Sequence, residues 1–348
     1  MSENRFILQE IGSFRKPDYL SNNFHKIFGT QEYFEKASKA SLETLALFKK
    51  AGINNFGVGG EMFRWEMYEH FANSVENINF YGLVRSFDNR YYRKGSVTGE
   101  ISRKSSLHKD EVEFLLKNTK QELKIPITGP YTMMDWSFNE KYPGRRELAN
   151  AFSQIIREEI KEIRSLWVKY RGDQKLQIQI DEPAATTHPS EMDIVVESVN
   201  RSFEGIGGLE TSIHVCYSID YGYLFNVIPD LKVEGYNLEF ANRDSMAPGE
   251  GVDKRPGYAD VKRFKEANDA VAKKRFLGLG VTDVHIDEIE SEELITDRIN
   301  TARKILDDDR ILRINPDCGL RTRSIQVGYQ KLLNMSEAVS KIEGNRND

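Results

Sequence analysis

Short apolar runs alternate with longer amphipathic stretches along almost the whole chain. Eight runs are predicted to be strands, and several are rich in Ile, Val and Phe and end in polar residues; they cover residues 6–14, 53–58, 124–128, 176–180, 212–216, 235–240, 275–280 and 311–315. Parallel strands that helices cover on both faces form continuous apolar runs of this kind. The alternation therefore predicts a (β/α)₈ barrel, and a doubly wound parallel sheet is the alternative. No G-x-G-x-x-G fingerprint follows the first run, which disfavours the dinucleotide-binding form of that alternative.

The segments between the strands have the periodicity of amphipathic helices. We expect helices at residues 32–50, 145–170, 190–202, 258–273, 291–307 and 323–335. Residues 79–102 (NFYGLVRSFDNRYYRKGSVTGEIS) break the alternation and are predicted to form a β-hairpin or long loop, either a plain surface hairpin or a lid over the site. No linker rich in Pro, Gly and Ser divides the chain, so we expect residues 1–348 to form one catalytic domain.

Composition excludes several classes of protein. The 348 residues carry a net charge of −5, and the 49 basic residues are spread without a block, so no nucleic-acid partner is expected. No stretch approaches the roughly 18 uninterrupted apolar residues of a membrane span, so no membrane partner is expected either. The first residues (MSENRF) lack the pattern of a secretory signal, and we expect a cytoplasmic protein.

The two cysteines, Cys216 and Cys318, are too few for a disulfide scaffold. His214 and Cys216 are two apart at the end of a predicted strand, so their side chains point to the same side. The next strand ends near Glu239 and the last near Cys318, and the carboxyl ends of barrel strands carry the active site. Two thiolates, an imidazole and a carboxylate suit Zn²⁺. The alternative is that these residues are ordinary core residues, as buried Cys commonly is.

A zinc ion with two thiolates and a carboxylate has a net negative ligand set. Such an electron-rich site is a poor Lewis acid for activating water, but it can bind a substrate thiol in its deprotonated form. The pattern therefore indicates a zinc-activated thiol and alkyl transfer to sulfur.

Seven motifs, in order along the chain, are similar to one family. The chain resembles the catalytic half of cobalamin-independent methionine synthase in IGSF (11–14), GGE (59–61), ITGPYTMMDWSF (127–138), QIDEPA (179–184), HVCYS (214–218), VTDVH (281–285) and NPDCGLRTR (315–323). The resemblance implies a (β/α)₈ barrel with one zinc ion held by His214, Cys216, Glu239 and Cys318. It also implies methyl transfer to the thiolate of homocysteine, giving methionine.

The same resemblance implies a homocysteine site. The substrate carboxylate would meet the backbone at Ser13, and its ammonium would meet Glu61 and Asp181, since charge-assisted hydrogen bonds are the strong ones. Asp181 is thus both a binding and a catalytic candidate. The alternatives are that Asp181 caps a helix and that Glu61 is a first-turn carboxylate favoured by a helix dipole.

Trp136 and His285 are implied on the methyl-donor side. In the family the tryptophan offers a flat face to the pterin of methyltetrahydrofolate, and His285 is the candidate general acid for the leaving nitrogen. The alternatives are a core tryptophan and a histidine packed against Asp283. The other histidines, at positions 25, 70, 108 and 188, are expected at the surface or at helix caps.

The sequence departs from the family on the donor side. Gly59 replaces the histidine of the family's HGE motif, and residues 185–187 are Ala-Thr-Thr where long members carry a charge. Short members are thought to use a methylated corrinoid or a corrinoid protein. The predicted donor is therefore methylcobalamin, a corrinoid protein or methyltetrahydrofolate.

Three other classes stay open at this point. The first is another zinc-dependent thiol alkyltransferase of the same superfamily, acting on coenzyme M or an epoxide. The second is a metal-free barrel lyase of the uroporphyrinogen decarboxylase kind. The third is a non-catalytic protein with a closed, structural zinc site.

Overall fold

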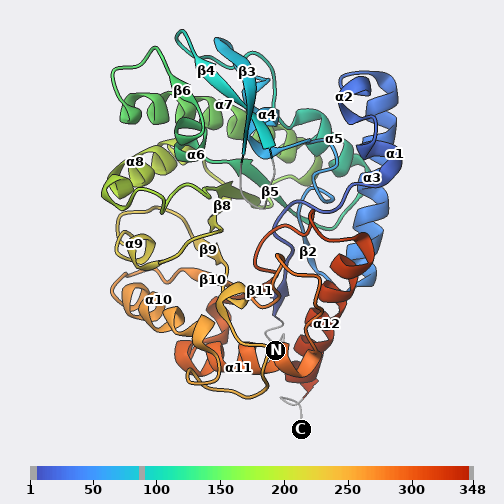
Figure 1. The fold of residues 1–348 in the computed structure, drawn as a ribbon, viewed down its shortest axis with the longest axis vertical. Helices are drawn as coiled ribbons and strands as arrows, with labels where there is room; N and C mark the ends of the chain where they lie inside the picture. Colours follow the sequence, from blue (N-terminus) through green and yellow to red (C-terminus); the bar gives the residue numbers. More distant parts are fainter. Residues whose placement is uncertain (1–5, 86–90, 345–348) are drawn as a thin grey trace.

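Eight parallel strands form a barrel with helices around it in the computed structural model, which describes residues 6–85 and 91–344 (Figure 1). Neighbouring strands around the barrel are, in order, β1 (Ile7–Leu8), β11 (Leu312–Asn315), β10 (Phe276–Gly280), β9 (Gly235–Leu238), β8 (Leu209–Val215), β7 (Leu176–Asp181), β5 (Glu122–Thr128) and β2 (Asn55–Phe56). All eight predicted strands are present, although the first is much shorter than the apolar run that predicted it.

The two edge strands of the sheet meet and close the barrel. Gln9 forms a parallel bridge with Asn55, and the backbone N–H of Asn54 donates to the carbonyl of Leu8 at 3.1 Å. The register places Asp181 opposite His214, and His214 opposite Asn237. The barrel prediction is confirmed, and the doubly wound alternative is wrong.

Helices surround the strands, as Figure 1 shows. They are α1 (Asp18–Ser21), α2 (Phe24–Ile27), α3 (Gln31–Lys50), α4 (Met67–Ala72), α5 (Lys109–Asn118), α6 (Pro130–Asp135), α7 (Arg145–Arg171), α8 (Met192–Phe203), α9 (Gly222–Phe225), α10 (Asp260–Asp269), α11 (Glu292–Leu306) and α12 (Ile325–Gly344). Within the described ranges, none of these helices has the length and apolar character that crossing a bilayer requires. Each of the six predicted helices has a counterpart, and α12 runs nine residues beyond its predicted end at 335.

The longest helix shows why the amphipathic pattern predicts these elements well. One face of α7 buries Phe152, Ile156, Ile160 and Ile163 at intervals of three or four residues. Its charged face remains in solvent, and the helix ends where Gly172 adopts a φ of +63°, a conformation that glycine reaches without a side-chain clash.

Hydrogen-bonded amides fill part of the barrel interior, below the carboxyl ends of the strands. The Gln9 side-chain amide donates to Asn237 Oδ1 at 2.7 Å, and Asn237 Nδ2 donates to Gln179 Oε1 at 2.8 Å. Gln179 Nε2 in turn donates to Asp181 Oδ1 at 2.7 Å. All three amide residues are fully buried. This chain of amides leads to the carboxylate of Asp181 and fixes its orientation.

The predicted insertion forms a small separate sheet. Antiparallel strands β3 (Ile78–Arg85) and β4 (Tyr91–Val97) form the hairpin, and β6 (Phe138–Asn139) pairs with β4 in parallel. Residues 86–90, in the connection of the hairpin, lie outside the described residues. The hairpin prediction is confirmed, and the pairing of β6 joins the hairpin to the segment that follows Trp136.

His108 takes the N-cap position of α5, one of the two positions expected for it, but its side chain is buried and does not cap the helix. It lies at the start of α5, but its side chain is 2% exposed, and its Nδ1 lies 3.2 Å from Glu159 Oε1. Glu159 also accepts from the backbone N–H groups of Leu107 and His108. Burial lowers the pKa of His108 to about 4, so the imidazole is neutral in the folded chain at neutral pH.

This burial predicts acid sensitivity. Between about pH 6.5 and pH 4 the unfolded chain binds a proton at His108 that the folded chain does not, so the free energy of unfolding falls as pH falls, by up to roughly 3 kcal/mol. Urea unfolding of His108→Asn should show a flatter pH dependence in this window than the unchanged protein. The control is Gln154→Ala, which changes an exposed residue that does not titrate on α7, the helix of Glu159, and should keep the original slope. Equal slopes for all three proteins would contradict the assignment.

Candidate active site

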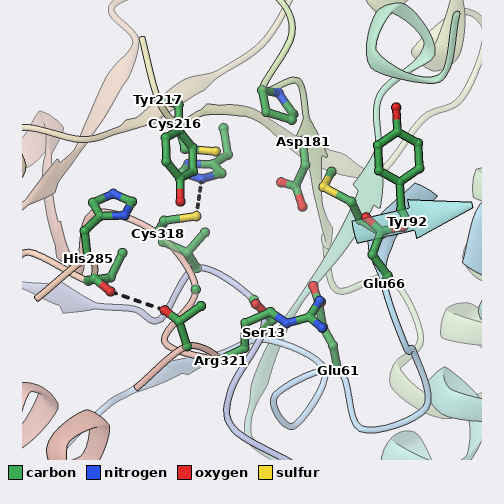
Figure 2. Close-up of a pocket in the computed structure, with 18 of the residues that line it drawn as sticks. Ser13, Glu61, Glu66, Tyr92, Asp181, Cys216, Tyr217, His285, Cys318 and Arg321 are labelled. Atoms are coloured by element: carbon green, nitrogen blue, oxygen red, sulfur yellow. Dashed lines mark hydrogen bonds between the residues drawn. The ribbon is translucent and has the colours of Figure 1, made fainter. Parts of the chain in front are cut away.

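A pocket opens at the carboxyl ends of the barrel strands (Figure 2). It brings together eight of the nine site residues predicted from the sequence. The wall contains Ser13, Glu61, Trp136, Asp181, His214, Cys216, His285 and Cys318. The ninth, Glu239, lies beside the wall and contacts His285.

A sulfur-rich cluster occupies one side of the pocket. His214 lies in β8, Cys216 directly follows this strand, and Cys318 follows β11. Their possible ligand atoms all lie within 4.8 Å of one another, and His214 Nε2 is 3.4 Å from Cys318 Sγ. Figure 2 shows the sulfur atoms of Cys216 and Cys318 on the same side of the pocket. The sequence predicted that these three side chains converge, and in the structure they lie together.

The tautomer of His214 fits a metal ligand. Its Nδ1 lies 2.9 Å from the backbone carbonyl of Asn237, which can only accept, so Nδ1 carries the hydrogen. Nε2 is then the nitrogen that faces the thiols and would bind a metal ion in place of a proton. A hydrogen bond from the far nitrogen to a carbonyl is the usual way in which metal-binding histidines are oriented.

The charges of the cluster also favour a cation. The hydrogen bond from Cys216 and the nearby His214 hold the pKa of Cys318 well below its usual value, although burial opposes this. Burial alone would lower the pKa of His214, but the Cys318 thiolate outweighs burial and raises it to about 9. A negative, buried set of imidazole and thiolate donors suits a soft divalent metal ion.

Glu239 lies next to this cluster and is held by other groups. Its Oε2 accepts from the backbone N–H of Tyr217 at 2.6 Å and from Asn242 Nδ2 at 2.9 Å. Its Oε1 lies 3.2 Å from His285 Nε2. The carboxylate is therefore outside the compact group of three ligands, and its predicted role as the fourth ligand remains a proposal.

Glu61 enters the pocket from a loop in an unusual conformation. Residues 59, 60 and 61 all have positive φ, and Glu61, which is not a glycine, has a φ of +58°. Its carboxylate packs on Gly12, where an added Cβ would lie 2.7 Å from Glu61 Oε1. Arg64 NH1 lies 3.6 Å from the same oxygen. Backbone strain at a non-glycine residue is common at functional sites, where a side chain must point into the pocket.

Asp181 and Ser13 line the same part of the pocket. Burial raises the pKa of Asp181 to about 7, although the neighbouring His214 opposes this rise. A cation placed beside Asp181 would favour the ionised form of its carboxyl group and lower this pKa. Ser13 packs closely on Gly319, where an added Cβ would lie 2.2 Å from Ser13 Oγ. The structure thus brings Ser13, Glu61 and Asp181 to one cavity, as predicted.

Trp136 and His285 lie on different parts of the wall. The ring of Trp136 packs on Tyr92 with centroids 5.4 Å apart, so this part of the wall is aromatic. His285 packs edge-on against Tyr217 at 4.7 Å and contacts Glu239. Asp283 accepts from the backbone N–H of His285, at 2.8 Å.

Among the pocket residues that were not singled out from the sequence are Glu66, Tyr217 and Arg321. Glu66 caps α4 by accepting from two backbone N–H groups, so a capping pattern was its only signal. Tyr217 and Arg321 lie within the HVCYS and NPDCGLRTR motifs, which could have pointed to them. Tyr91 and Tyr92 also line the pocket, and they belong to the aromatic-rich hairpin for which a lid over the site was one of the two expectations.

Comparison with known proteins identifies the family. Residues 8–341 match the family described as the catalytic domain of cobalamin-independent synthase. This chain belongs to that family. A methionine synthase from Thermoplasma acidophilum is 58% identical over 336 residues, covering 97% of this chain and 98% of the relative. One from Pyrococcus furiosus is 35% identical over 334 residues, covering 94% and 90%. The family predicted from the seven motifs is confirmed, and its enzyme class is the predicted one, a methyltransferase of the methionine synthase type.

Solved structures show the same fold. A B12-independent methionine synthase from Shewanella sp. W3-18-1, in complex with selenomethionine, superposes with a TM-score of 0.80 at 23% identity and covers 99% of each chain. A methyltransferase from Methanosarcina mazei has a TM-score of 0.60 at 11% identity, covering 98% of this chain and 95% of its own.

The cluster predicts one bound metal ion that depends on both cysteines. Cys216→Ser and Cys318→Ser should each weaken metal binding by more than about 100-fold, because a hydroxyl replaces a thiolate ligand. Metal content after dialysis, measured by elemental analysis, tests this. His188→Asn removes a histidine that is not part of the cluster and should keep the full metal content. Normal metal content in Cys318→Ser would exclude this ligand set.

Proposed function

We propose that the chain transfers a methyl group to the thiolate of L-homocysteine and forms L-methionine, with one Zn²⁺ ion held by His214, Cys216, Glu239 and Cys318. The observation that carries the proposal is the meeting of the thiol–imidazole cluster with the carboxylates of Glu61 and Asp181 in one pocket. The name methionine synthase, borne by relatives that match nearly the whole chain, supports the same reaction.

The proposed roles of the site residues follow from their charges. When bound, zinc would supply the positive charge that removes the proton from the substrate thiol at neutral pH. Glu61 and Asp181 would bind the substrate ammonium, and the backbone at Ser13 would bind its carboxylate. These contacts would place the substrate sulfur at the cluster and aim it toward the aromatic wall of Trp136, from which the methyl group arrives. His285 would supply a proton if the leaving group is an amine.

We propose a methylated corrinoid, free or on a protein, or methyltetrahydrofolate as the donor. The cavity of about 110 Å³ is smaller than the roughly 300–1,000 Å³ of pockets for drug-sized ligands, so the bulk of either donor would remain at its mouth. A histidine at position 59, as in the HGE motif, would be strained here, because Gly59 has a φ of +65° and an added Cβ would lie 3.1 Å from Ser41 Cβ and 3.2 Å from Ser41 O. This difference supports a donor contact unlike that of the long enzymes and favours the corrinoid.

A donor screen tests the reaction. Zinc-loaded protein with homocysteine and methylcobalamin should form methionine, and methyltetrahydrofolate should be the poorer donor; mass spectrometry measures the product. Coenzyme M offered in place of homocysteine is the acceptor control and should remain unmethylated. Methylation of coenzyme M in preference to homocysteine would assign the chain to another thiol alkyltransferase class. Methionine from neither donor, even with a methylated corrinoid protein added, would refute the proposal.

The proposed ammonium site predicts that one substitution weakens the binding of homocysteine more than that of a thiol without an amino group. Asp181→Asn should raise the KM for homocysteine by about 10–100-fold, the worth of one charge-assisted hydrogen bond. Reaction with 4-mercaptobutyrate, which lacks the amino group, should change far less. Asp193→Asn, at an exposed carboxylate far from the pocket, is the matched control. Equal effects of Asp181→Asn on both thiols would show that this carboxylate does not bind the ammonium.

A further inference from the structure

We propose that Asp317 is a positioning residue of the metal centre: its carboxylate ties the loop that carries Glu239 to the loop that carries Cys318. The inference rests on the zinc site of the proposed function. It concerns a residue that lies behind the ligands rather than in the pocket.

The carboxylate of Asp317 accepts hydrogen bonds from three backbone N–H groups. Its Oδ1 accepts from Phe240 and Ala241, both at 3.0 Å, and its Oδ2 accepts from Asn242 at 2.6 Å. These three residues directly follow Glu239, and Asp317 directly precedes Cys318. The side chain is fully buried. One carboxylate therefore connects the two loops on which two proposed ligands are placed.

Strands β9 and β11 do not hydrogen-bond to each other, so no direct backbone pairing connects the loops that follow them. Strand β10 lies between β9, which leads to Glu239, and β11, which leads to Cys318. Asp317 crosses the end of this intervening strand, where Gly280 has no side chain. An added Cβ at Gly280 would lie 2.1 Å from Asp317 Oδ1. The backbone N–H of Asp317 also donates to the carbonyl of Thr282 at 3.0 Å, so residue 317 joins the ends of all three strands.

The chemistry of the contact requires a carboxylate. Three N–H donors converge on the two oxygens, and an asparagine would present an NH₂ group in place of one of them. If that group faced Asn242, two donors would oppose each other at 2.6 Å. Ion–dipole hydrogen bonds to a charged acceptor are also stronger than those to an amide. Loss of these contacts frees Glu239 to shift relative to Cys318, which a tetrahedral site does not tolerate.

Zinc affinity of the whole chain tests the proposal. Asp317→Asn should bind zinc about 10–100-fold more weakly in competition with a chromophoric chelator, the usual effect of losing a partner behind the ligands. Asp317→Ala should have the same effect, because it removes both acceptor oxygens without adding bulk and alters no proposed ligand. In cobalt-substituted protein the sulfur-to-cobalt absorption should persist, since both cysteines remain, while the geometry-sensitive bands shift.

The control is Glu159→Gln. Glu159 is another buried carboxylate that accepts from two backbone N–H groups, but it lies away from the metal centre. The substitution Glu159→Gln should lower the Tm of the metal-free protein and leave its zinc affinity unchanged. If Asp317→Asn and Asp317→Ala likewise lower only the Tm, or if either folds and binds zinc as the unchanged protein does, the proposal is overturned. Should Asp317→Asn fail to fold, Asp317→Ala decides.

The outcome is independent of turnover. An unchanged protein that binds zinc but forms no methionine would refute the proposed function, while the comparison of zinc affinities would still decide the role of Asp317. An unchanged protein that binds no zinc would refute the metal centre on which both proposals depend.

Discussion

Closure of a parallel sheet through the Gln9–Asn55 bridge brings the carboxyl end of every barrel strand to one rim. Ser13 and His214, which are 201 positions apart in the sequence, thereby line the same cavity. The parallel register also places Asp181 directly opposite His214 on neighbouring strands. The chemistry of the site follows from this arrangement, because each reactive side chain lies at or just beyond a strand end, where the backbone leaves the ladder and side chains can turn inward.

The pocket concentrates negative charge where solvent is excluded. Glu61, Asp181, Glu239 and Cys318 are acidic groups in or beside the same cavity, and burial opposes charge on such groups. A folded chain tolerates such a set when cations compensate for it. A divalent metal at the sulfur cluster and an ammonium between Glu61 and Asp181 would provide that compensation at two separate points. Under the proposed function, specificity for an amino-acid thiol would follow from this distribution of charge.

The sequence predicted the barrel, its eight strands and the convergence of His214, Cys216 and Cys318, because strand period and order determine these features. It did not predict the position of Glu239, whose carboxylate is held by His285 and by the N–H of Tyr217 rather than within the ligand group. Burial of His108 also escaped prediction, since it depends on Glu159 of a distant helix. Tyr92 reaches the pocket only through the folding of the hairpin. Contacts of this kind are set by tertiary packing, which local patterns do not encode.

The small sheet gives the aromatic wall a mechanical property. Strand β6 begins two residues after Trp136 and pairs with β4, the strand that carries Tyr92. The rings of Trp136 and Tyr92 also pack on each other. A displacement of the hairpin would therefore move the indole as well, so the two rings form one unit whose position depends on the small sheet and not on the barrel strands that carry the sulfur atoms.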